Sequence, residues 1–440
     1  MASKAALRTS AHTDASVDGF GMIVEAPGEG RFVVAARDIP AGALVHIASP
    51  YTVTIAPRCQ LTRCVGCLCK VTAVPGTQGV PSHKRSKQGK QHKGHGANAS
   101  SSPPGACADG PILCSQCERA VFCGSACRSS YEPEHFASGE CAVLRAVREN
   151  VYCRTEQETE SLTIWLQIAA RAMHEGHALS FDPWAGVDPD PAEVSDPSTM
   201  FNTENNIDAA PRGGTTADSP HVHEKMTSRP SGVEVLDPEV ATDVARLQAH
   251  TPSWRQMAAL VCNVSLLSKK ECALSSSMYR VVSGFIGYYP RLSAQKISEH
   301  MFRRIYGAVK CNAFGVYEPS GLCYATCMYP SASYFNHSCA PNLCRVMQGR
   351  RVHFYTIHPV AQGDPLCITY TDPDVNKSER REVLLNSWRF ECACTRCSKD
   401  APLRAKYCNR CRGAGIGIIR PLDSTMTMGE CVICKAIWPM

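Results

Sequence analysis

The sequence lacks any long apolar stretch. Its longest apolar run, residues 257–267, falls well short of the ~18 residues that a helix needs to span a bilayer. The N-terminus also lacks the apolar core that a signal peptide requires, so we expect no secretory leader and no membrane anchor. Neither sign of charge is in strong excess, since 46 Lys and Arg residues stand against 40 Asp and Glu residues. The resulting net charge of +6 argues neither for nor against nucleic acid as a general partner.

Cysteine, by contrast, is abundant, with 26 residues in a chain of 440. A disulfide scaffold would suit a short secreted chain, whereas this length predicts about two or three folded units. Many of the cysteines form CxxC pairs that lie far apart in the sequence, which favours zinc ligation by reduced thiolates. We therefore expect a zinc protein of the nucleus, the cytoplasm or both.

Two stretches interrupt the pattern of a folded chain. Residues 71–110 are rich in Lys, His, Gly, Ser and Pro, and residues 181–235 are rich in Pro, Asp, Ser and Thr. Both have few apolar residues to bury, so we predict a disordered basic insertion and a disordered acidic insertion. The basic run between Lys84 and Lys93 could serve nuclear import or contact nucleic acid, although a solvated loop is the simpler interpretation.

The remaining sequence predicts a mixed α+β fold. Short β-branched runs in residues 31–55, separated by the turn Pro40-Ala41-Gly42, indicate strands. Apolar residues at helical spacing predict amphipathic helices over residues 158–174, 254–267 and 294–310. Short strands punctuated by Gly, Pro and Asn return in residues 314–370.

The first cysteine set offers eight metal ligands, enough for two tetrahedral zinc sites. These ligands are Cys64, Cys67, Cys114, Cys117, Cys123, Cys127, His135 and Cys141. Their spacing resembles the MYND zinc finger, although the basic insertion widens one gap and the histidine stands further from the last cysteine than usual. The resemblance implies interleaved pairs, with one ion on Cys64, Cys67, Cys123 and Cys127 and the other on Cys114, Cys117, His135 and Cys141. A RING finger, the nearest alternative, usually places its histidine earlier. Cys69 and Cys107 could substitute as ligands, but we interpret both as free thiols.

Two further cysteine sets predict two more zinc sites. The first combines the thiol of Cys339, in the segment Asn336-His337-Ser338-Cys339, with a CxCxxC at Cys392, Cys394 and Cys397. The second is a pair of CxxC motifs with the form of a zinc ribbon, made by Cys408, Cys411, Cys431 and Cys434. Four thiolates leave no open coordination position for catalysis, so we expect these zinc ions to be structural.

Together these motifs resemble the SET and MYND domain-containing protein lysine methyltransferase family over roughly residues 27–397. The resemblance implies a SET-domain β-clip fold in which the segment at Asn336 and the strand ending at Tyr370 pass through one another as a pseudoknot. It also implies a MYND finger inserted into the SET domain, a helical insert and a post-SET zinc site. The corresponding segments are 18–60, 61–141, 142–310, 311–375 and 376–400, and the ribbon occupies 401–440.

The same resemblance assigns a cofactor site for S-adenosylmethionine and a catalytic residue. A Gly-x-Gly turn that contacts the cofactor corresponds to Gly28, Gly30 and the adjoining Arg31. The family's further cofactor residues correspond to Asn312, Asn336, His337 and Phe390, of which Phe390 would pack on the adenine. Tyr370 corresponds to the catalytic tyrosine. Trp388 departs from the pattern, because many relatives have a second channel tyrosine there, and this leaves the number of methyl groups transferred open.

The chemistry that this resemblance implies explains the residue types. Methyl transfer from a sulfonium to an amine is an in-line displacement that needs alignment within ~3–3.5 Å, without a metal or a covalent intermediate. The substrate lysine must be neutral, and an apolar channel beside the sulfonium disfavours its ammonium form. We expect Tyr370 to orient the amine and no Asp or Glu to act as a general base.

Partners and alternatives follow from the same motifs. Larger members of the family end in a helical superhelix over the substrate groove, whereas about 40 residues follow Cys397 here. We therefore expect an open groove, a protein substrate with a flexible lysine-containing tail, histone or not, and a Pro-rich peptide partner for the finger. One alternative is an adaptor with a catalytically weak SET scaffold. Another is a zinc protein that binds nucleic acid through residues 84–93, with an affinity that falls steeply with salt.

Overall fold

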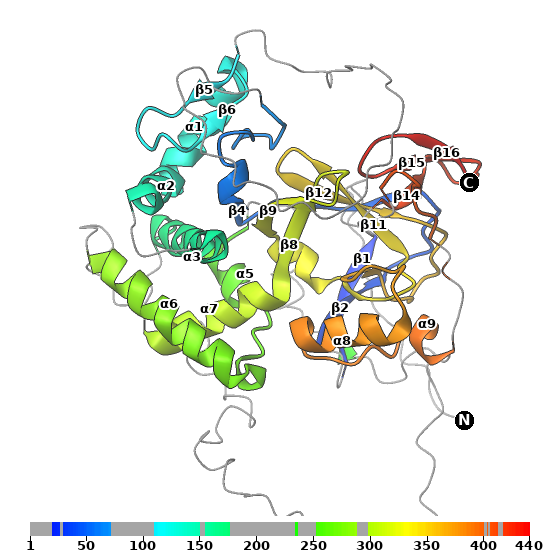
Figure 1. Cartoon of the computed structure of the whole chain (residues 1–440). Coiled ribbons are helices and arrows are strands. Elements are labelled where there is room, and N and C mark those ends of the chain that lie inside the picture. The colour runs from blue at the N-terminus through cyan, green and yellow to red at the C-terminus, as the bar shows by residue number, and fades with distance from the viewer. Residues whose placement is uncertain are drawn as a thin grey trace, which may run out of the picture.

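Helices and several small sheets make up the chain, which confirms the mixed class predicted from the sequence (Figure 1). The computed structural model describes residues 20–26, 30–71, 110–149, 155–176, 234–235, 252–287, 298–399, 403, 405–411 and 417–440. Within these ranges the strands form six sheets of two or three strands each. No helix in the same ranges is both long and apolar enough to cross a bilayer. Gly28, Cys107, residues 72–109 of the basic insertion and residues 181–233 of the acidic insertion lie outside the described residues.

Strands from the N-terminal end of the chain pair with strands from its last third. β3 (Leu44–Ala48) pairs antiparallel with β12 (Arg351–Thr356), and β4 (Thr52–Ile55) pairs antiparallel with β9 (Cys323–Met328). The same two sheets end in β11 (Leu343–Gln348) and β8 (Ala313–Tyr317). Figure 1 accordingly shows blue strands among yellow ones. The core is therefore split in sequence, and the described residues between 56 and 312 belong to neither of these two sheets.

A third sheet lies at the start of the described chain. β1 (Gly21–Ala26) and β2 (Gly30–Ala35) form an antiparallel hairpin, and β7 (Glu234–Val235) pairs with the outer edge of β1. β7 forms from the last two residues of the segment predicted as the acidic insertion, so that prediction of disorder is wrong for these two residues. Leu366 ties β2 to the later chain by donating its backbone N–H to Val33 O at 2.8 Å.

The finger segment, residues 61–141, contains little sheet structure in its described parts, residues 61–71 and 110–141. After the short helix η2 (Pro57–Cys59) come the two-stranded hairpin β5 (Ile112–Leu113) and β6 (Val121–Phe122), then α1 (Ser125–Ala137). α2 (Glu140–Glu149) leads out of it. Two-residue strands bury too little apolar surface to hold such a segment, and bound zinc is the usual substitute for a core in domains of this kind.

The helices between the two halves of the core pack on one another. They are α3 (Glu156–His174), α5 (Trp254–Ala258), η4 (Val264–Leu266), α6 (Lys269–Gly287) and α7 (Glu299–Asn312). Thr155 and Glu158 form a capping box that starts α3 two residues before its predicted start. The indole of Trp165 stacks on Phe302 of α7 with ring centroids 4.2 Å apart, and Trp254 is fully buried beside them.

The predicted helix over residues 254–267 is wrong. α5 ends after five residues, and Asn263 takes a left-handed conformation with φ of 45°. The apolar spacing of this run comes from burial against α7. A Cβ at Gly307, in the middle of α7, would lie 2.0 Å from the carbonyl oxygen of Cys262, so only glycine lets the helix approach this loop. α6 was not predicted, and the helix predicted over residues 294–310 is found as α7.

The C-terminal third holds the remaining elements. η5 (Pro330–Tyr334) leads into β10 (Asn336–His337), which pairs with β13 (Cys367–Ile368). α8 (Lys377–Trp388) and α9 (Thr395–Ser398) follow. The ribbon segment, described at residues 403, 405–411 and 417–440, ends the chain as the sheet of β14 (Ile419–Pro421), β15 (Met428–Cys431) and β16 (Ile437–Pro439). In Figure 1 it lies beside β11, on the opposite side of the core from α6.

Candidate active site

Two segments that are 30 residues apart in sequence meet at the centre of the C-terminal third. β10 and β13 run parallel, with Asn336 opposite Cys367 and His337 opposite Ile368. The backbone N–H of Ser338 donates to Ile368 O at 2.9 Å, which continues the pairing beyond β10. Asn342 completes the junction, because its Oδ1 accepts from the N–H of Cys367 at 2.7 Å. Tyr370, two residues after β13, is thereby placed beside His337.

Tyr370 is fixed by two hydrogen bonds to this neighbouring segment. Its backbone N–H donates to Nδ1 of His337 at 3.0 Å, and its hydroxyl donates to Phe335 O at 2.8 Å. Burial of the side chain raises the pKa of Tyr370 above its ordinary value, and the nearby thiols of Cys367 and Cys311 act in the same direction. The hydroxyl is therefore a neutral group at physiological pH, and its lone pairs remain available to accept a hydrogen bond.

His337 connects Tyr370 to the third cysteine set. Because Nδ1 accepts from the backbone of Tyr370, the proton of the neutral ring lies on Nε2, which is 3.2 Å from the sulfur of Cys339. Burial lowers the pKa of His337 to about 4, so the neutral ring is the stable form at pH 7. The tautomer that suits Tyr370 is thus also the one that donates to Cys339.

Aromatic rings surround this pair. The ring of Trp388 lies with its centroid 5.2 Å from that of Tyr370, and the ring of Phe390 lies 6.0 Å from that of His337. Between them Arg389 ends α8 in a left-handed conformation, with φ of 65°, so the chain turns sharply and brings both rings to the site. The result is a half-buried, largely apolar surface around one tyrosine hydroxyl.

Arg31 and Asn312 do not contact Tyr370 or His337 but the loop between α5 and η4. The guanidinium of Arg31 donates to Ala259 O at 2.6 Å and lies 5.5 Å from the ring centre of Tyr334. The amide of Asn312 donates to Val261 O and to Ala308 O, both at 2.8 Å. Asn312 is the last residue of α7, and its side chain joins the end of that helix to the loop. The sequence pattern predicts a helix here and does not identify the loop. Asn263, a residue type that tolerates the left-handed conformation found there, was a possible signal of the turn.

All sixteen predicted metal ligands lie in the four predicted quartets, within each of which the ligand atoms are within 4.8 Å of one another. Sulfur pairs are 3.4 Å apart for Cys64 and Cys127, 3.8 Å for Cys114 and Cys141, 3.6 Å for Cys339 and Cys397, and 3.6 Å for Cys408 and Cys434. A tetrahedron with Zn–S bonds of ~2.3 Å has edges of about 3.8 Å, so the four quartets fit zinc. Cys69 belongs to none of them.

Outer contacts support two of these quartets. Nδ1 of His135 pairs with Glu140 at 2.7 Å, which leaves Nε2 facing the sulfur of Cys117. Such carboxylate–histidine pairs fix the ring of a zinc ligand. At the third quartet, the buried guanidinium of Arg380 lies 3.9 Å from the sulfur of Cys397 and donates to Val375 O at 2.6 Å. Its positive charge offsets part of the charge of four thiolates.

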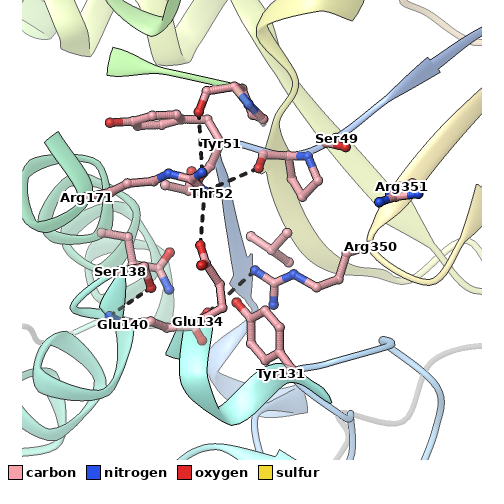
Figure 2. Close-up of a pocket in the computed structure, with 14 residues that line it drawn as sticks. Ser49, Tyr51, Thr52, Tyr131, Glu134, Ser138, Glu140, Arg171, Arg350 and Arg351 are labelled. Atoms are coloured by element: carbon pink, nitrogen blue, oxygen red, sulfur yellow. Dashed lines mark hydrogen bonds and ion pairs between the residues drawn. The ribbon is translucent and has the colours of Figure 1, made fainter. Parts of the chain in front are cut away.

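The finger segment docks on the core around a small cavity of about 170 Å³ (Figure 2). Arg171 of α3 donates to Tyr51 O at 2.6 Å and lies 3.8 Å from Glu134 of α1. Arg350, from the turn between β11 and β12, lies 3.8 Å from Glu140 and 4.2 Å from the ring centre of Tyr131. Since Glu140 also holds His135, one carboxylate links Arg350 of the core to the histidine of the second quartet.

The structure brings some of the predicted cofactor and catalytic residues together around Asn336, while others contact a different part of the chain. Tyr370, His337 and Phe390 gather around Asn336, and the third quartet adjoins them. Arg31 and Asn312 contact the loop of Ala259 and Val261 instead. Gly30 is the first residue of β2, and Gly28 lies outside the described residues.

Comparisons with known proteins point to one family. The model of the SET domain matches residues 30–371, more than half of the chain. A SET and MYND domain-containing protein of Dictyostelium discoideum is 32% identical over 136 residues, which are 29% of this chain and 35% of that protein. A potential protein lysine methyltransferase of Saccharomyces cerevisiae is 34% identical over 110 residues, 24% of this chain and 30% of that protein. The histone-lysine N-methyltransferase SMYD3 of Homo sapiens is 34% identical over 101 residues, 22% of this chain and 24% of that protein. The matches therefore span about a third or less of the length of these relatives.

Proposed function

The chain belongs to the SET domain family, and on this basis we propose that it is an S-adenosylmethionine-dependent protein-lysine N-methyltransferase acting on a histone or another protein. The observation that carries the proposal is the parallel pair of β10 and β13, which sets Tyr370 beside His337 and directs its hydroxyl to Phe335 O, the carbonyl just before Asn336. Relatives that are named as lysine methyltransferases support the same reaction.

The residues around Asn336 fit the proposed cofactor. A half-buried amide, a neutral imidazole and the flat face of Phe390 lie together, and such groups suit an amino acid moiety and an adenine ring. Asn336, His337 and Phe390 would hold the cofactor on one side, and Arg31 and Asn312 would contact it from the loop of Ala259 and Val261. Gly28 and Gly30 keep the cofactor role that the family resemblance gives them. S-adenosylmethionine, when bound, supplies an electrophilic methyl group on a positively charged sulfur.

Tyr370 would position the substrate amine. Because its hydroxyl proton is directed to Phe335 O, a lone pair of the same oxygen can accept an N–H of the target lysine and orient the nitrogen. The rings of Tyr370 and Trp388 exclude water from this point, and a desolvated site favours the neutral amine over the ammonium. Since Tyr370 is held by a carbonyl and an imidazole, its orientation needs no carboxylate.

The four zinc sites would be structural. Their cysteine and histidine ligands leave no vacant coordination position, and the third site holds Cys339 next to His337. The interleaved pairs of the finger segment support the assignment of a MYND finger inserted into the SET domain. We place the protein in the nucleus or the cytoplasm, where thiolates remain reduced.

The alternative function is an adaptor whose finger binds Pro-rich peptides and whose SET domain is a scaffold. The observation in its favour is Trp388, because an indole packs beside Tyr370 where the family resemblance implies a second tyrosine. The two functions differ in cofactor binding, so calorimetry separates them. An adaptor would give no heat on titration with S-adenosylmethionine.

The decisive experiment combines calorimetry with labelling. Zinc-loaded protein is titrated with S-adenosylmethionine and then incubated with methyl-labelled cofactor and a cell extract. We expect wild type to label protein lysine at least about tenfold faster than Tyr370→Phe, a loss of about 1.4 kcal/mol or more in the barrier. Tyr355→Phe, which removes a hydroxyl from β12 outside the site, should label like wild type. Equal labelling by wild type and Tyr370→Phe would contradict the mechanism.

A further inference from the structure

A groove of about 630 Å³ lies between the core and the ribbon segment, separate from the rings around Tyr370. Three parts of the chain line it. β8 and β11 contribute core residues, Arg63 and Lys70 come from the finger segment, and Val432, Ile433 and Lys435 come from the ribbon segment. The groove therefore exists only where all three parts meet.

Both strands along this groove are edge strands. Within the described residues, β8 is the last strand of the sheet β4-β9-β8, and β11 is the last strand of the sheet β11-β12-β3. An edge strand presents backbone N–H and C=O groups that can pair with an added extended peptide. The groove thus offers backbone hydrogen bonding along its length and not only side-chain contacts.

Aromatic side chains form its floor. The guanidinium of Arg345, from β11, lies over the ring of Phe314, from β8, with 5.7 Å to the ring centre, so the two strands face each other across the floor. Tyr317 folds back over Gly315, where a Cβ would lie 2.7 Å from the tyrosine hydroxyl. A side chain at position 315 would overlap the ring of Tyr317, so only glycine allows this packing. The ring of Tyr317 is half-buried beside the groove.

The charge of the lining is strongly positive. Four of its sixteen residues are basic and one, Glu318, is acidic. Glu318 is already paired with Arg63, which also stacks 3.9 Å over the ring of Tyr324. Lys70 and Lys435 are exposed and Arg345 is half-buried, so three positive charges remain around one groove. An anionic ligand is the one that such a surface attracts.

The groove adjoins the candidate active site. β8 starts at Ala313, directly after Asn312, and β11 starts at Leu343, directly after Asn342, whose backbone N–H donates to Cys367 O at 3.2 Å. Phe314, Met347 and Tyr370 all pack against the same core cluster. Both strands therefore start at the candidate site, and a segment lying along them in the groove would extend toward it.

We propose that this groove binds an extended acidic segment of the protein substrate, next to the target lysine, and that the ribbon segment forms the wall that selects it. The proposal rests on the proposed function and adds the charge of the substrate to it. The backbone edges of β8 and β11 hold the segment without regard to sequence, while Lys70, Arg345 and Lys435 favour Asp and Glu side chains. Val432, Ile433 and Lys435 form one side of this groove.

The test measures peptide binding separately from catalysis. Full-length zinc-loaded protein is mixed at low ionic strength with a fluorescein-labelled peptide in which Asp, Glu and Leu flank one central lysine. A matched peptide carries Asn and Gln in place of Asp and Glu. Fluorescence anisotropy should give a Kd at least about tenfold lower for the acidic peptide, and added salt should reduce the difference.

Two charge reversals locate the binding. Lys70→Glu and Lys435→Glu lie on exposed positions of different segments, and each should weaken acidic-peptide binding about threefold to tenfold. Lys406→Glu, an exposed ribbon lysine outside the groove, should leave Kd unchanged. Zinc content and thermal melting confirm that each variant is folded.

The outcomes separate this inference from the proposed function. Equal affinity for the two peptides overturns the inference. An affinity for the acidic peptide that Lys70→Glu and Lys435→Glu leave unchanged also overturns it, because the peptide would then bind elsewhere, for example on residues 84–93. If methyl transfer occurs without charge preference, the inference fails and the proposed function stands. If the acidic peptide binds as expected while S-adenosylmethionine gives no heat, the groove stands as a docking site and the proposed function fails.

Discussion

At the scale of single residues, His337 connects the candidate catalytic tyrosine to the third quartet. Its two ring nitrogens are committed in opposite directions, one accepting from the backbone of Tyr370 and the other donating toward Cys339. A cysteine of the third quartet is therefore two contacts away from the tyrosine that would orient the substrate. This makes the third quartet and the geometry of Tyr370 parts of one arrangement.

Trp388 determines how much space lies beside Tyr370. We expect Trp388→Ala to raise the share of di- and trimethylated product, because removing an indole 5.2 Å from the tyrosine ring makes room for a bulkier amine. Mass spectrometry of the labelled substrate measures the distribution. Leu385→Ala, at an exposed position of the same helix, is the control and should not alter it. An unchanged distribution in Trp388→Ala would remove the indole from the channel.

His46 gives a prediction about pH. It is 3% exposed, its Nε2 lies 3.0 Å from Ser331 Oγ, and burial lowers its pKa from 6.5 to about 4. The unfolded chain therefore takes up a proton first, so the stability that neutral His46 contributes is present above pH 6.5 and is lost as the pH falls toward 4. Between pH 6.5 and pH 5 this loss is about 1.5 kcal/mol.

Denaturant unfolding at the two pH values checks the prediction. His46→Gln keeps a partner for Ser331 but does not titrate, so its free energy of unfolding should fall by about 1.5 kcal/mol less than that of wild type. Acid effects on the zinc sites are common to both proteins and cancel in the comparison. Parallel losses in the two proteins would show that His46 is not the group responsible.

At the scale of elements, the contact between the finger segment and the core depends on one turn. Arg350 lies between β11 and β12 and touches Glu140, the ring of Tyr131 and, through a short hydrogen bond, Val65 O. Glu140 is buried and has its pKa lowered, with burial opposed by Arg350 and His135. Removing the guanidinium would leave this carboxylate with fewer partners.

We expect Arg350→Ala to cost about 3 kcal/mol, because a buried charge loses a partner. The effect should be local, so hydrogen exchange should accelerate in α1 and α2 and remain slow in β9 and β12. Arg351→Ala, at the next position, the exposed first residue of β12, is the matched control and should leave exchange unchanged. Uniform acceleration throughout the chain would argue against a separate docking contact.

At the scale of the whole molecule, the four quartets should hold four zinc ions with different effects on function. We expect Cys394→Ser and Cys411→Ser each to lower the zinc content from four to three per chain. Only Cys394→Ser should weaken S-adenosylmethionine binding, by about tenfold or more, because its quartet contains Cys339 and adjoins Phe390. Atomic emission and calorimetry measure the two quantities. Loss of cofactor binding in Cys411→Ser would contradict the prediction that the third quartet, and not the ribbon quartet, supports the cofactor site.

The four quartets could be predicted because they depend on the spacing of neighbouring residues. A CxxC pair brings two thiolates together within one turn of backbone, so each quartet follows from the sequence once its pairs are matched. The matching itself needed the resemblance to a known finger, since eight ligands can be divided in many ways. The helix over residues 254–267 failed because apolar spacing records burial and does not distinguish a helix from a packed loop.

The sequence alone predicted the four groups of potential metal ligands and the segments that meet at Tyr370, because ligand type, turn residues and apolar period act over a few neighbouring positions. Only the tertiary structure decided what those segments face. The hydrogen bonds of His337 and Tyr370, the loop held by Arg31 and Asn312, and the positive groove between β8, β11 and the ribbon segment all join residues that are distant in sequence. Such contacts depend on how separate elements pack, and no local pattern specifies the partner across a packing interface.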